Sequence, residues 1–157
     1  MKKKKKSKNK SKYRKIPKKI SDSELKKIIS KTNILLINES ELHLLTKEQN
    51  VDKSIKEVLC MGPEKVIVKF GSKGAKCFSK SENIVVGVYP VKEVIDPTGA
   101  GDVFGGGFIS GLVDGLSTKR AMLRGSALAS FCIEDFGVKK LLNVSVNEVD
   151  NRIQLIN

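Results

Sequence analysis

The stretch DPTGAGDVFGGGF, residues 96–108, combines a nearly bare backbone with two carboxylates placed six positions apart. Gly99 and Gly101 lack the Cβ atoms that would keep a phosphate at a distance. A helix that begins there would point its unpaired N–H groups and its positive dipole end at whatever lies in front of it. The spacing therefore predicts an anion-binding cradle.

Asp102 lies inside this cradle, where its charge would repel a phosphate. The placement makes sense if Asp102 takes a proton from an acceptor hydroxyl while the cradle stabilises the charge on a transferring phosphoryl group. The alternative is a glycine-rich turn in which Asp102 only complements the helix dipole. Neither of the best-known phosphate loops is present: Phe104 replaces the third glycine of the dinucleotide fingerprint, and no P-loop sequence occurs.

The elements that would position this segment follow from the apolar patterns. Strands are expected at 33–38, 65–70, 75–79, 83–90 and 91–95, with a tight turn at 71–74. Helices are expected at 25–30 after a Ser21–Glu24 capping box, at 39–46, at 54–61 with Gly62 as C-cap, at 99–115, at 118–136 ended by Gly137, and from Ser145 onward. Strands separated by helices predict an α/β layered domain with a partly parallel sheet.

The charge of the chain is concentrated at its start. Twelve of the 30 basic residues fall in residues 1–20, which contain no acid, leaving 18 basic against 17 acidic residues in the rest. Residues 1–20 are predicted to be a disordered lysine-rich tail, and 21–157 a folded domain. The tail could be a nucleic-acid arm or a solvated extension; with Tyr13 its one aromatic residue, the second interpretation is favoured.

The cysteines and the apolar runs favour a cytoplasmic protein. Cys60, Cys77 and Cys132 are odd in number and far apart, which predicts unpaired, buried thiols in a reducing compartment. His43 has no partner at metal-ligand spacing. No apolar run reaches the roughly 18 residues of a membrane span, and no signal-peptide core follows the basic start.

DPTGAGD followed by an apolar helix resembles the signature of the ribokinase-like (PfkB) carbohydrate kinase family. Three further segments are similar to family motifs in the same order: NESE (38–41), VIVKFGSKGAKCF (66–78) and GSALASFCIEDFG (125–137). The resemblance implies a ribokinase-like three-layer α/β/α fold over residues 21–157. It also implies ATP-dependent phosphorylation of a hydroxyl on a sugar or nucleoside.

The resemblance assigns roles to the glycine-rich stretch and to the turn after residue 70. Asp102 would be the catalytic base, and the backbone of Gly99, Ala100 and Gly101 would form the anion hole.

Gly71 and Gly74 would let the turn lie against the nucleotide, with Ser72 between them. Lys69 stands where many family members carry threonine. Its side chain could pair with a phosphate or point outward, and both interpretations stay open.

The remaining candidates concern the nucleotide and two cations. Asn38 would lie near the phosphates and Glu41 would help to hold Mg²⁺ through water. Their alternatives are a plain helix N-cap and a solvated first-turn acid. Ser126 would face the adenine, or it is a small packing residue.

Asp96 and Thr98 resemble part of a loop that binds a monovalent cation such as K⁺. Gly137 would contribute a carbonyl to that loop.

The chain departs from the family in its length, because family members carry a first half with the sugar-binding residues and a β lid. We therefore expect a C-terminal half with a nucleotide site and a catalytic base, little acceptor site, and an exposed sheet edge. A missing N-terminal half or a second chain would then be a partner. The alternative is a remnant that binds nucleotide or a partner, catalyses nothing, and carries a basic tail for nucleic acid.

Overall fold

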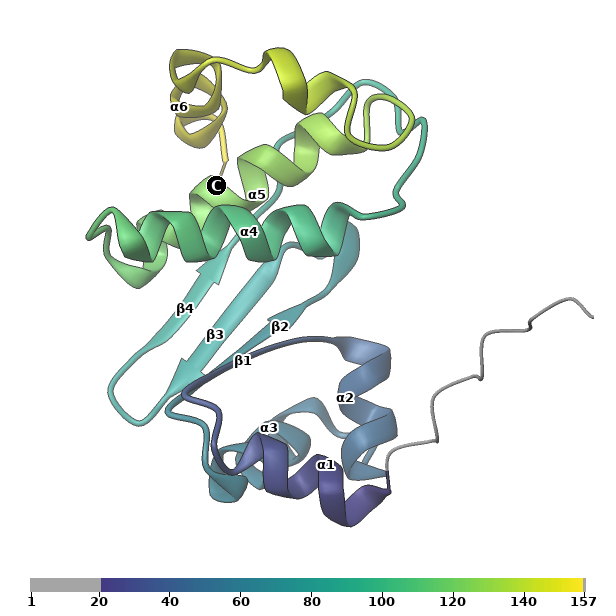
Figure 1. Cartoon of the computed structure of the whole chain (residues 1–157), viewed down its shortest axis with the longest axis vertical. Helices are drawn as coiled ribbons and strands as arrows, with labels where there is room; N and C mark the ends of the chain where they lie inside the picture. Colours follow the sequence, from purple (N-terminus) through teal and green to yellow (C-terminus); the bar gives the residue numbers. More distant parts are fainter. Residues whose placement is uncertain (1–20, 157) are drawn as a thin grey trace, which may run out of the picture.

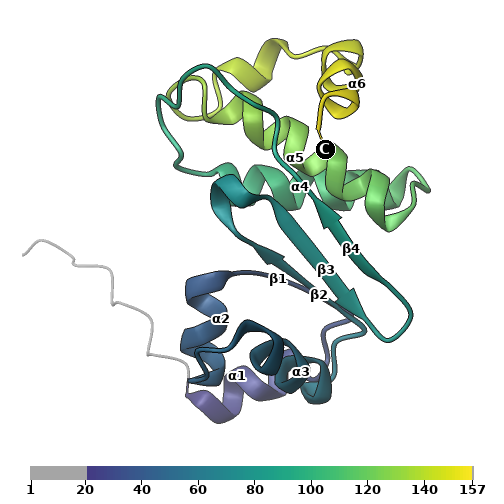
Figure 2. The same cartoon turned by 180° about the vertical axis from the view of Figure 1, so that it is seen from behind.

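The computed structural model describes residues 21–156 as an α/β fold in three layers, with a sheet between two layers of helices (Figures 1 and 2). Its four strands lie in the order in which they occur along the chain: β1 (Ile34–Asn38), β2 (Lys65–Lys69), β3 (Ala75–Ser79) and β4 (Asn83–Val86). β1 runs parallel to β2 and the other pairs are antiparallel. The predicted layered domain with a partly parallel sheet is confirmed, and the prediction of a disordered tail at 1–20 lies outside the described residues.

Two groups of helices cover the sheet. One face carries α1 (Asp22–Ile29), α2 (Glu39–Thr46) and α3 (Val51–Met61) (Figure 1). The other face carries α4 (Ala100–Val113) and α5 (Thr118–Cys132), and α6 (Val146–Gln154) packs on α5. Short 3₁₀ turns occupy Gly71–Lys73 and Lys140–Asn143.

β2 is the strand that joins the two layers of core. Val66 and Val68 point into the core under α2 and α3, whereas Ile67 points into the core under α4 and α5. All three side chains are fully buried. A strand buried on both faces is expected to be a continuous run of β-branched residues, as KVIVK is. The C-terminal end of β2 is thereby held rigidly between the layers.

Two glycines let α4 and α5 approach until their backbones touch. A Cβ on Gly107 would lie 2.9 Å from the Cα of Gly125, and a Cβ on Gly125 would lie 2.6 Å from the carbonyl oxygen of Phe104. Real Cβ atoms do not come this close to a backbone. Part of the glycine-rich stretch therefore serves helix packing, while its first glycines remain free for the cradle.

The structure corrects four details. Residues 91–95 do not form a strand: the N–H of Ile95 donates to the carbonyl of Ile133, 2.8 Å away, so this backbone bonds to the end of a helix. The helix α5 ends at Cys132, with Ile133 as its C-cap, and does not run to Gly137. The predicted strand at 83–90 ends at Val86. Cys77 and Cys132 are buried as expected, but Cys60 is exposed.

β1 is an edge strand, as the sequence led us to expect. Within residues 21–156 it pairs with β2 on one side and with no strand on the other. No helix in this part of the chain is long and apolar enough to cross a bilayer.

Adjacent glycines of α4 provide a test of the helix contact. Gly107→Ala should lower the free energy of unfolding by about 1–3 kcal/mol, because the new methyl group meets the backbone of α5. Gly106→Ala places the same methyl group where no atom lies within 4 Å. This substitution should raise the free energy of unfolding by about 0.5–1 kcal/mol, because alanine has the higher helix propensity. Urea unfolding of both variants measures the difference, and equal effects of the two substitutions would contradict the packing described.

Candidate active site

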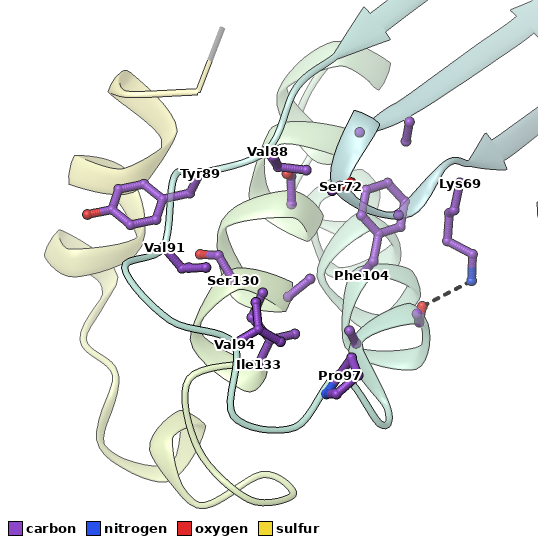
Figure 3. Close-up of a pocket in the computed structure, with 17 residues that line it drawn as sticks. Lys69, Ser72, Val88, Tyr89, Val91, Val94, Pro97, Phe104, Ser130 and Ile133 are labelled. Atoms are coloured by element: carbon purple, nitrogen blue, oxygen red, sulfur yellow. Dashed lines mark hydrogen bonds between the residues drawn. The ribbon is translucent and has the colours of Figure 1, made fainter.

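A cavity of about 390 Å³ opens where the C-terminal end of β2 faces the beginning of α4. Its walls come from the turn after β2, from residues 88–97, from the first turn of α4 and from α5 (Figure 3). Seven of the residues predicted to form the site line it: Lys69, Gly71, Ser72, Gly74, Ala100, Gly101 and Ser126.

The beginning of α4 differs from that of every other α-helix in the described part of the chain. The five others have a side chain at the N-cap that accepts a hydrogen bond from the first turn: Ser21, Asn38, Asn50, Ser117 and Ser145. The N-cap of α4 is Gly99, with φ of 81° and no side-chain hydrogen bond. A helix end left open in this way needs another acceptor for its N–H groups.

Two N–H groups at this helix end have no acceptor among residues 21–156. They belong to Gly99 and Gly101. The N–H of Ala100 donates to the carbonyl of Pro97 over 3.2 Å, and that of Asp102 donates to the carbonyl of Gly99 over 3.0 Å. The predicted anion hole thus offers two free donors, from Gly99 and Gly101, whereas the N–H of Ala100 between them is already used within the turn.

Asp102 follows directly in the first turn of α4 and is exposed. It does not line the cavity itself but stands beside Gly101, which does. The residue is therefore accessible to a molecule in solution next to the part of α4 that lines the cavity.

The opposite part of the cavity is apolar. Val88, Tyr89, Val91, Val94 and Ile133 line it, and sequence reasoning did not assign them to the site (Figure 3). Residues 88–90 were expected to continue a strand, although a proline within a run is a sign of an edge or a loop. Pro90 is thus the residue whose type indicates that the strand ends before this segment. This wall suits a flat, apolar group such as a nucleobase.

Ser126 lies on the same side of the cavity, and its hydroxyl is already in use. It donates to the carbonyl of Gly87 over 2.8 Å, which ties α5 to the segment that leaves β4. The residue is 6% exposed. This contact agrees with the packing interpretation of Ser126, and its small size also leaves room in the cavity.

Asn38 and Glu41 form a reciprocal cap at the start of α2. The Asn38 side chain accepts from the N–H of Glu41 over 2.8 Å, and the Glu41 carboxylate accepts from the N–H of Asn38 over 2.9 Å. Neither residue lines the cavity. Asn38 is nevertheless the register partner of Lys69 across β1 and β2, so the motif ends at the same edge of the sheet as the cavity.

The candidates for a monovalent-cation loop come together around Cys132. The Sγ of its buried thiol lies 3.7 Å from the carbonyl oxygen of Thr98 and 3.5 Å from that of Gly137, and its single S–H can donate to either. The carboxylate of Asp96 accepts from the N–H of Thr98 over 2.9 Å. Hydrogen bonds from Thr98 and then from Gly137 lower the pKa of Asp96, while burial, followed by the charge of Asp96, raises the pKa of the Cys132 thiol. The loop thus offers hard oxygen atoms and one ionised carboxylate.

Arg152 of α6 supports the apolar wall from behind, a role that sequence reasoning missed. Its guanidinium lies 3.5 Å from the ring centroid of Phe131 and 4.3 Å from that of Tyr89. It also donates to the hydroxyl of Ser130 over 2.7 Å and pairs with Glu134 over 2.5 Å. Stacking of an arginine on aromatic faces is worth about 0.5–2 kcal/mol, so α6 helps to hold the cavity wall in place.

The chain resembles known proteins over most of its length. The sequence profile described as "pfkB family carbohydrate kinase" matches residues 2–143. An uncharacterized sugar kinase of Archaeoglobus fulgidus is 36% identical over 125 residues, which cover 79% of this chain and 49% of that protein. A nucleoside kinase of Methanocaldococcus jannaschii is 36% identical over 115 residues, covering 72% of this chain and 36% of that protein.

A solved structure shows the same fold. The crystal structure of a putative ribokinase II from E. coli in complex with ATP and Mg²⁺ superposes with a TM-score of 0.75 at 33% identity. The match covers 84% of this chain and 42% of that one. The chain therefore spans half or less of the length of these relatives.

The ion pairs behind the wall make stability depend on pH. Burial raises the pKa of Glu134, but hydrogen bonds from Lys140 and Arg152 outweigh it, so the pKa is lowered overall. A carboxyl with a lowered folded-state pKa stabilises the protein above its unfolded pKa of about 4.3, and this contribution is lost as the pH falls through the folded value. Glu134→Gln should lower the free energy of unfolding by about 1 kcal/mol at pH 7 and leave it unchanged in acid.

Urea unfolding at a series of pH values from about 7 to about 3 checks this. Glu57→Gln, an exposed position on α3 with no ion pair among the described residues, is the matched control and should change little at any pH. A Glu134→Gln deficit that persisted in acid would show that shape or packing, and not charge, explains it.

Proposed function

The chain belongs to the PfkB family of carbohydrate kinases, and we propose that it transfers a phosphoryl group from ATP to a hydroxyl of a sugar or nucleoside. In this proposal the described residues form the nucleotide-binding and catalytic part of the enzyme. We place the reaction in the cytoplasm, in keeping with the three free cysteines.

The open beginning of α4 carries the proposal. Among the described α-helices it is the start without a side-chain cap, and it faces a cavity whose far side is apolar. Free N–H groups at one end suit a phosphate chain, and Tyr89 with its valine neighbours suits a base at the other end. A nucleoside triphosphate carries both groups, with a charged phosphate chain at one end and a flat base at the other.

Asp102 supplies the base in this mechanism. The acceptor O–H gives its proton to the Asp102 carboxylate, and the acceptor oxygen forms a bond to the terminal phosphorus of ATP. The bond from that phosphorus to the bridging oxygen breaks, and ADP leaves with the electron pair. The N–H groups of Gly99 and Gly101 hold the negative charge that develops on the transferred group.

The proposal includes two cations, which ATP-dependent transfer uses to neutralise phosphate charge. Glu41 would hold Mg²⁺ through water. Its Oε2 caps α2, and no side-chain hydrogen bond of the described residues uses its Oε1, so a carboxylate oxygen is left for the ion. Asp96 with the carbonyls of Thr98 and Gly137 would hold K⁺, and the thiol of Cys132 is too weak a donor to occupy those carbonyls fully.

The length of the relatives supports a second candidate function. Because the chain spans half or less of those proteins, the groups that bind the acceptor would have to come from elsewhere. A chain with the nucleotide site alone would bind ATP and transfer nothing.

Replacing the proposed base tests the first candidate. Asp102→Asn should lower phosphoryl transfer by about 10²–10⁴-fold, because the amide cannot take the proton, while Mg–ATP binds at least as tightly. Calorimetric titration with Mg–ATP measures binding, and transfer of labelled phosphate to a panel of sugars and nucleosides measures the reaction. Full transfer by the variant would remove Asp102 from the mechanism.

The same two measurements separate the candidates. Binding of Mg–ATP together with transfer that Asp102→Asn abolishes supports the kinase. Binding without transfer to any acceptor supports the non-catalytic nucleotide-binding protein. Failure of the unaltered chain to bind Mg–ATP would overturn both.

A further inference from the structure

One charged side chain, that of Lys69, is found among the residues that line the cavity. It is half-buried at the last position of β2, and its Nζ donates to the carbonyl of Gly101 over 3.3 Å (Figure 3). A Cβ on Gly101 would lie 2.8 Å from this Nζ. The ammonium group therefore rests against the first turn of α4, at the end of the cavity that Gly101 lines.

This ammonium group has little to satisfy it. None of the ion pairs within residues 21–156 includes Lys69. An ammonium carries three N–H donors, and one carbonyl at 3.3 Å is the partner found for them in this part of the chain. A partly buried charge without a counter-charge is costly, so the site favours the arrival of an anion.

The base of the side chain is held firmly. Lys69 pairs in register with Asn38 on one side and with Ala75 on the other, and the strand it ends is buried on both faces. Only the flexible stem of the lysine can move. The ammonium can thus leave the Gly101 carbonyl for an anion in the cradle without any change in the sheet.

We propose that Lys69 binds the terminal phosphate of ATP and is a binding and catalytic residue of this site; the inference rests on the proposed nucleotide site. Gly101, which the ammonium touches, is followed by Asp102. Because the acceptor attacks the terminal phosphorus next to Asp102, that phosphate must lie at this end of the cavity. There a lysine acts as a point charge on two or more oxygens, and it shares the developing charge with the free N–H groups of α4.

The test compares ligands that differ in their phosphates. Lys69→Met keeps the length of the stem and removes the charge. It should weaken the binding of Mg–ATP by at least about tenfold, weaken that of Mg–ADP much less, and leave the affinity for adenosine within about twofold. Lys73→Met is the matched control: it removes the same charge from the turn that follows β2, but Lys73 is exposed and does not line the cavity. Its effect on all three ligands should stay within about twofold.

Titration calorimetry with ATP, ADP and adenosine distinguishes the outcomes that support the proposal from those that overturn it. A loss confined to ATP supports the proposal, and retained adenosine binding shows that the variant is folded. Equal losses for ATP and ADP would overturn the assignment to the terminal phosphate. Unchanged ATP affinity, or an equal effect of Lys73→Met, would overturn the role of Lys69 while leaving the nucleotide site intact. Unaltered protein that bound neither ATP nor adenosine would overturn the site and the inference together.

Discussion

The N–H groups left free at the start of α4 are the constraint on which the rest of the site depends. The other described α-helices close their first turn with the side chain of their N-cap residue, whereas α4 begins without such a cap. Such groups need an acceptor, and the surrounding elements are arranged to admit one. β2 and its turn supply one wall of the cavity and α5 supplies another.

The position of that helix end is set from a distance. Gly107 and Gly125 fix the separation of α4 and α5, and Ser126, the next residue, ties α5 to Gly87. Arg152 then adds the last helix to the same wall by stacking on Tyr89 and Phe131. The charged and the apolar ends of the cavity are thus positioned by one helix, α5, which itself lines the cavity with Ser126, Ala129 and Ser130.

Local signals in the sequence predicted much of this arrangement. The capping box at Ser21, the β-branched run of β2 and the glycines around Asp102 involve residues that are neighbours in the sequence, so the sequence alone predicts a helix, a strand and an open helix start there. The apolar pattern of residues 91–95 predicts a strand, but the hydrogen-bond partner of Ile95 is the carbonyl at the end of α5, which lies far away in the sequence. The stacking of Arg152 joins residues more than twenty positions apart, and no spacing rule reaches that far. The direction of Lys69 was open for the same reason.

β1 has a consequence for how the molecule behaves in a crowded solution. Its sequence, ILLIN, carries no charge and no proline, the usual defences of a sheet edge, and its outer side pairs with nothing in the described chain. Copies of the chain therefore compete with any complementary strand for the same row of backbone groups. Pairing between two copies becomes faster with the square of the protein concentration. The fraction of unaggregated protein should therefore fall as the concentration rises, unless a strand from elsewhere pairs with the edge first.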